Sequence, residues 1–64
     1  SLIQTNMILL LVQGNNIPKF SRNYSNIFLL NPSDTLRKRI EKKYQMNINI
    51  IYQSEYSSLW KLSE

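Results

Sequence analysis

The chain has 64 residues, a formal net charge of +4 and neither cysteine nor histidine. A chain of this length makes one small domain, residues 1–64, that buries only about 60% of its unfolded surface and usually needs a further stabilising element. The composition excludes disulfides and metal sites built from thiolate or imidazole ligands, which leaves a partner chain as the expected stabilising element.

The first two predicted strands are apolar segments bounded by turn residues. Residues 6–12, NMILLLV, end before a turn signal at Gly14 and are far shorter than the roughly 20 residues that span a bilayer. After a loop at 14–23, residues 24–30, YSNIFLL, are rich in aromatic and branched side chains and stop before Pro32. We expect the two strands to pair as an antiparallel hairpin.

Residues 34–45 carry the signals of a helix. Ser33 and Asp34 are candidate N-cap residues, because each side chain can accept a hydrogen bond from a free N–H of the first turn. An apolar stripe follows at four-residue spacing: Leu36, Ile40 and Tyr44. The helix is expected to end near Asn47, which tolerates the left-handed conformation of a helix C-terminus.

The rest of the chain is predicted as one further strand and a short helix. Residues 47–53, NINIIYQ, alternate between apolar and polar side chains, with Ile48, Ile50 and Tyr52 on one face. Residues 54–64 are a candidate short C-terminal helix whose Trp60 packs back on the sheet. The sequence therefore predicts an α+β fold with ββαβ order and one helix on one face of the sheet.

Several segments resemble the ubiquitin-like β-grasp family. NPSDT at 31–35 resembles the segment that caps the family's helix, LRKRIEKKYQM at 36–46 resembles the helix itself, and NIIYQSEY at 49–56 is similar to the third strand. LLVQGNNIPKF at 10–20 is similar to the autophagy branch, in which a Gly-Asn turn follows the first strand. The resemblance implies a small β-grasp-like sheet. Since the final long strand and the Gly-Gly tail are missing, it implies a minimal form that is not conjugated.

Both faces of the predicted first hairpin are apolar, although one helix covers only one of them. The uncovered face of an antiparallel sheet is usually polar, so either residues 54–64 or a partner protein is expected to cover it. Because side chains alternate between the two faces of a strand, one residue of the pair Leu9 and Leu10 points away from the helix, and so does one of Phe28 and Leu29. The sequence does not show which residue of each pair it is. The candidate partner-binding residues are Ile8, Leu10, Val12, Phe28, Leu30 and Ile51.

The predicted helix also carries a cluster of basic residues. The favoured interpretation is a solvated polar face, because this density of charge is ordinary on protein surfaces. The alternative is a stripe that contacts phosphates, in a small ribonucleoprotein or ribosomal accessory component. The candidate RNA-binding residues are Lys19, Arg22, Lys38, Arg39, Lys42 and Lys43.

No motif in the sequence supports catalysis. The four acidic residues are scattered, there is no Gly-rich loop, and no base accompanies the serines and tyrosines. We therefore expect a non-enzymatic protein–protein interaction module that docks on a partner protein or larger assembly, with no cofactor, metal or small-molecule substrate. The lack of cysteine fits a reducing, intracellular compartment.

Overall fold

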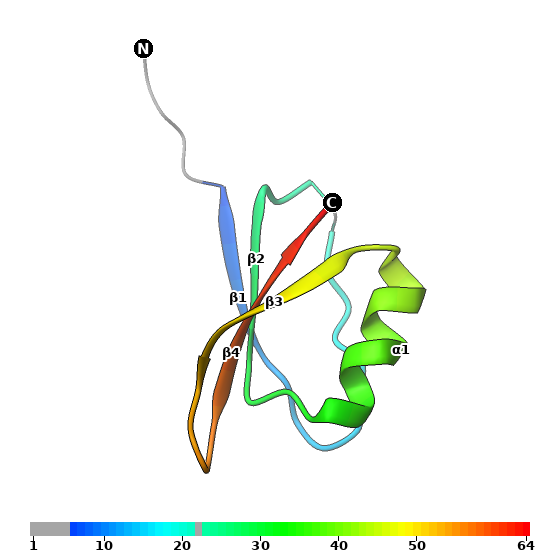
Figure 1. Ribbon diagram of the computed structural model, residues 1–64. Coiled ribbons are helices and arrows are strands. Elements are labelled where there is room, and N and C mark those ends of the chain that lie inside the picture. The colour runs from blue at the N-terminus through cyan, green and yellow to red at the C-terminus, as the bar shows by residue number, and fades with distance from the viewer. Residues whose placement is uncertain (1–5, 22) are drawn as a thin grey trace.

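The computed structural model describes residues 6–21 and 23–64. The elements of this part of the chain are β1 (Met7–Leu11), β2 (Asn26–Leu30), α1 (Asp34–Tyr44), β3 (Asn47–Gln53) and β4 (Ser58–Ser63). The strands form one mixed sheet in the order β1-β2-β4-β3, and α1 lies against one side of it (Figure 1). The α+β class predicted from the sequence is confirmed. We call the side that faces α1 the inner face of the sheet and the opposite side the outer face.

The helix begins where the sequence predicts. Ser33 is the N-cap residue, and its Oγ accepts a hydrogen bond from the Leu36 N–H at 3.3 Å. At the other end Gln45 takes the left-handed conformation, with φ of 53°, so the helix ends before the expected Asn47. Gln45 has no special preference for this conformation, which is why the sequence pointed to the asparagine instead.

The core lies between the inner face and α1. Leu36 and Ile40 are fully buried there, as the helical spacing predicts, while Tyr44 is half-buried. The Tyr44 hydroxyl donates to the Pro18 carbonyl at 2.7 Å, and its ring stacks on Phe20 with centroids 4.1 Å apart. These contacts fix the loop after β1 against the helix. The buried apolar residues are Val12, Ile27, Leu29, Leu36, Ile40, Met46, Trp60 and Leu62.

Replacing Ser33 by Ala is expected to lower the free energy of unfolding by about 0.5–1 kcal/mol. The value lies at the low end for a helix cap because the Leu36 N–H also reaches the Ser33 carbonyl, at 3.1 Å. Thermal unfolding followed by circular dichroism measures the effect. An unchanged melting temperature would contradict the role of the Ser33 side chain as the cap.

β1 and β2 run parallel, which corrects the antiparallel hairpin expected from the sequence. Ile8 lies beside Ile27 and Leu10 beside Leu29. A parallel pair needs a connection of about a dozen residues or more, and residues 12–25 are long enough. The described parts of this connection, 12–21 and 23–25, contain no helix. Part of this connection packs on the core through Ile17, Phe20 and Tyr24. The burial of these side chains holds the crossover on the inner side of the sheet.

The C-terminal segment is a strand, not the short helix expected. Ser54 closes the turn that precedes this strand. The Ser54 Oγ accepts a hydrogen bond from the Ser57 N–H at 3.2 Å, and the Ser54 N–H donates one to the Ser57 carbonyl at 2.8 Å. A serine side chain binds backbone N–H groups in the same way in a tight turn and at a helix start, so the local signal does not separate the two. β4 then enters the sheet between β2 and β3. A final strand is therefore present where the sequence predicts none.

Candidate functional site

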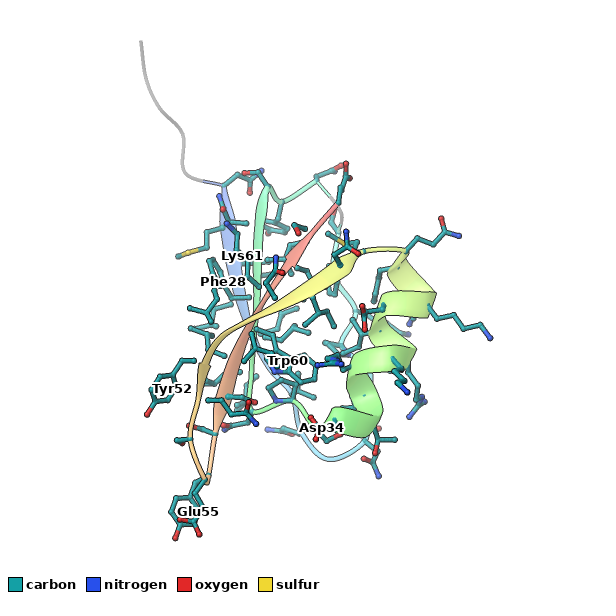
Figure 2. All side chains as sticks on the ribbon, viewed as in Figure 1. Phe28, Asp34, Tyr52, Glu55, Trp60 and Lys61 are labelled. Atoms are coloured by element: carbon teal, nitrogen blue, oxygen red, sulfur yellow. The ribbon has the colours of Figure 1, made fainter. Side chains whose placement is uncertain are left out.

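Alternation along the two central strands decides which side chains form the outer face. Ile27 and Leu29 are 1% and 0% exposed on the inner face, so Phe28 between them points outward. β4 alternates in the same way, with Ser58, Trp60 and Leu62 buried. The outward residues of the two central strands are Asn26, Phe28, Leu30, Leu59, Lys61 and Ser63. Figure 2 shows Trp60 between the sheet and α1, with Phe28 and Tyr52 on the other side.

β1 contributes three strongly exposed apolar side chains to the outer face. Met7, Leu9 and Leu11 are 55%, 58% and 56% exposed. Ile8 and Leu10, which alternate with them, pack against the core instead. β1 therefore has an apolar residue at every position, three turned outward and two turned inward.

Cross-strand pairing joins these residues into one surface. Leu11, Leu30, Leu59 and Tyr52 follow one another across all four strands. Leu9 lies beside Phe28 in the next row. We call this surface the outer apolar patch, formed by Met7, Leu9, Leu11, Phe28, Leu30, Tyr52 and Leu59. Its central part is a shallow apolar hollow lined by Met7, Leu9, Phe28 and Leu59.

One cation borders the outer apolar patch. Lys61 lies between Phe28 on β2 and Asn49 on β3, and it forms no ion pair with any described residue. Beyond it the face becomes polar, since the Asn49 amide donates to the Ser63 hydroxyl at 3.5 Å. The outer face thus has an apolar part over β1 and β2, a row that extends to Tyr52, and a polar corner over β3 and β4.

Of the six residues expected to bind a partner, three are accessible at the surface of the sheet and three pack in or against the core. Phe28 and Leu30 lie on the outer face, and Ile51 is 52% exposed at an irregularity in β3. Corrections apply to the other three: Ile8, Leu10 and Val12 pack in or against the core. Segment 6–12 is apolar throughout, so its pattern does not reveal which set of alternate residues faces inward.

The expected set lacks five residues of the outer apolar patch. Met7, Leu9 and Leu11 lie outward on β1 where the alternate residues were expected. The other two are Leu59 and Tyr52. Leu59 was expected on a helix, and Tyr52 was expected on the same face as Ile48 and Ile50. A register shift between Ile50 and Tyr52 inserts an extra residue, which turns the tyrosine to the outer face. Nothing in the local sequence marks that shift. The alternation of Trp60 and Leu62 with Lys61 and Ser63 was the available signal for β4.

The C-terminal segment does not cover the outer face. Trp60 was expected to pack there if residues 54–64 folded back, but it is 1% exposed on the inner face. β4 widens the sheet and adds Leu59 to the outer apolar patch. In the part of the chain that the structure describes, no second layer lies over this patch.

Four of the five basic residues of α1 are exposed to solvent, and Arg37 is half-buried. Lys38, Arg39, Lys42 and Lys43 all project from the helix, and Lys19 is exposed in the loop after β1. Arg22, the sixth residue of the expected RNA-binding set, lies outside the described residues. Two of the exposed cations have contacts of their own. Arg39 donates to the Asn15 carbonyl at 3.4 Å, and the Lys43 ammonium lies 5.3 Å from the Tyr44 ring centroid.

The described residues show no arrangement that could hold a metal ion, since no three carboxylates gather at one place among them. The only helix in residues 6–21 and 23–64 is too short and too polar to cross a membrane. Comparisons with protein-family models, with curated proteins and with solved structures found no match. The resemblance to the ubiquitin-like family is therefore not tested and stays a prediction.

Proposed function

We propose that this chain is a non-enzymatic protein–protein interaction module that docks on a partner protein through the outer apolar patch. The observation that supports the proposal is the row of Leu11, Leu30, Leu59 and Tyr52, which crosses the whole sheet without cover from any described element. Contiguous exposed apolar patches mark interaction sites on proteins. A sheet that is apolar on both faces buries the second face only when another layer packs on it.

Lys61 adds a chemical requirement for the partner. Lys61 lies at the border of the outer apolar patch and forms no ion pair with any described residue. A partner that buries this border without offering a carboxylate would leave a charge unpaired, which is costly. The partner surface that fits is therefore apolar, with an acidic side chain opposite Lys61.

The proposal is tested by binding measurements on matched variants. Affinity purification near physiological salt identifies the partner, and calorimetry with the purified partner then gives the affinity. Phe28→Asp is expected to weaken binding at least roughly 30-fold, because it places a carboxylate in the middle of the apolar contact. The control is the double variant Lys38→Ala and Lys42→Ala, which alters only exposed positions of α1 and should bind normally.

The alternative, RNA binding through the exposed basic residues of α1, gives the opposite result. Binding would then weaken steeply as salt rises, because each phosphate contact releases a counterion. The double lysine variant would lose affinity, and Phe28→Asp would keep it. That combination, with nucleic acid in the purified complex, would replace the docking proposal by a ribonucleoprotein role.

A further inference from the structure

We infer that the free edge of β1 pairs with β1 of a second copy of this chain, antiparallel and centred on Leu9. β1 stands at one border of the sheet, with β2 on its other side (Figure 1). The inference goes beyond the docking proposed above, because the contact is made by the backbone edge of β1. It needs no partner protein and leaves the side chains of the outer apolar patch available.

The hydrogen bonds between β1 and β2 show which backbone groups of β1 are already paired within the described part of the chain. The Val12 N–H donates to the Leu30 carbonyl, and the Asn26 N–H donates to the Asn6 carbonyl, each at 3.0 Å. Successive residues of a strand turn their N–H and C=O groups to opposite sides. The even-numbered residues therefore bond to β2. The residues whose N–H and C=O groups point to the open edge are Met7, Leu9 and Leu11.

These three residues are complementary to a second copy of themselves. A two-fold axis at Leu9 places Leu9 opposite Leu9 and Met7 opposite Leu11, each as a pair that exchanges two backbone hydrogen bonds. Directly opposite residues point to the same face of a sheet, so the outer apolar patches of the two copies join on one side. All residues of Met7–Leu11 are uncharged, and no like charges meet at the contact.

The two borders of the sheet differ in how they resist such pairing. Natural edge strands are protected by charges, prolines or bulges. The β3 edge has a register shift between Ile50 and Tyr52 together with polar residues at both ends. β1 is regular and contains neither a charge nor a proline. In the edge-paired dimer the two Lys61 residues are five strand spacings apart, about 24 Å, where salt screens their repulsion.

The register of the contact is tested by cysteine cross-linking, since the chain has no cysteine of its own. Leu9→Cys places two thiols directly opposite each other, with Cα atoms about 5.5 Å apart, which suits a disulfide. In the Met7→Cys variant, the cysteines of the two copies are four residues apart along the strands, about 13 Å. This variant should therefore form the disulfide between copies at least tenfold more slowly than Leu9→Cys. A mixture of Met7→Cys and Leu11→Cys should give the mixed disulfide. Trp60 fluorescence checks that each variant is folded.

Sedimentation equilibrium of the unmodified chain gives the second readout. Its mean mass is expected to rise from 7.6 kDa toward twice that value as the concentration is raised from about 10 μM to about 1 mM. A chain that stays at 7.6 kDa throughout overturns the inference. So does a dimer in which Met7→Cys cross-links as fast as Leu9→Cys, because another surface would then join the copies. Adding Leu59→Asp, which changes the outer apolar patch two strands away from β1, should leave the cross-linking unchanged. This result separates edge pairing from partner docking.

Discussion

Replacing Leu29 by Asp is expected to unfold the chain, whereas replacing Phe28, one residue earlier, is expected to leave it folded. Leu29 is 0% exposed between the sheet and α1. The variant loses about 1.5–3 kcal/mol of apolar burial, and protonating a carboxyl of ordinary pKa at pH 7 costs a further ~4 kcal/mol. A chain of this size has a stability of about 3–10 kcal/mol, so the loss is comparable with the whole.

Phe28 is the matched control because it lies on the same strand with the opposite orientation. An Asp at this position keeps its charge in contact with water, and the main loss is the lower strand propensity, about 1 kcal/mol. Helix content by circular dichroism and the emission of Trp60, the single tryptophan, report folding at pH 7. If Phe28→Asp unfolds the chain and Leu29→Asp does not, the assignment of inner and outer faces is wrong.

The helix could be predicted because its signals are local. Ser33 and Leu36 are three residues apart, and Leu36 and Ile40 are one helical turn apart, so the cap and the buried stripe can be recognised within a single segment. The same holds for β2, whose bounds lie within the predicted 24–30. Each of these elements is specified by neighbours in the sequence, and the tertiary structure agrees with that local preference.

The sheet pairing could not be predicted, because it depends on contacts between distant segments. The connection between β1 and β2 packs on the core through Ile17, Phe20 and Tyr24, and β1 runs parallel to β2. The sequence shows only two apolar segments with a loop between them. The orientation of β1 has the same cause. Because β1 is apolar at every position, only the packing of Ile8 and Leu10 against the core decides which side faces out.

The candidate site was predictable in part. Phe28 and Leu30 alternate with residues of a strand whose limits were clear, so their common face followed once Leu29 was known to be buried. The contribution of β4 was not predictable, because Ser54 marks a turn and a helix start equally well. The sequence indicated that the second face of the sheet is apolar. It did not indicate that this face extends to Tyr52, because the orientation of Tyr52 depends on the register shift in β3.

Replacing Trp60 by Ala is expected to lower the free energy of unfolding by about 3–5 kcal/mol. Trp60 is 1% exposed between the sheet and α1, and its neighbours across the sheet are Leu29 of β2 and Ile50 of β3. Removing the ring loses its apolar burial and leaves a cavity that α1 can close only by moving. Urea unfolding followed by circular dichroism measures the change, since the variant has no tryptophan emission.

Leu59→Ala is the matched control, on the same strand but on the outer face. Leu59 is half-buried and borders an open hollow, so its truncation leaves no enclosed cavity and should cost about 1 kcal/mol. The ratio of the decreases in unfolding free energy for Trp60→Ala and Leu59→Ala therefore compares the packing of the inner face with that of the outer face. Equal losses would mean that the outer face is packed as tightly as the inner one. The outer apolar patch would then already be covered, and the docking proposal would lose its physical basis.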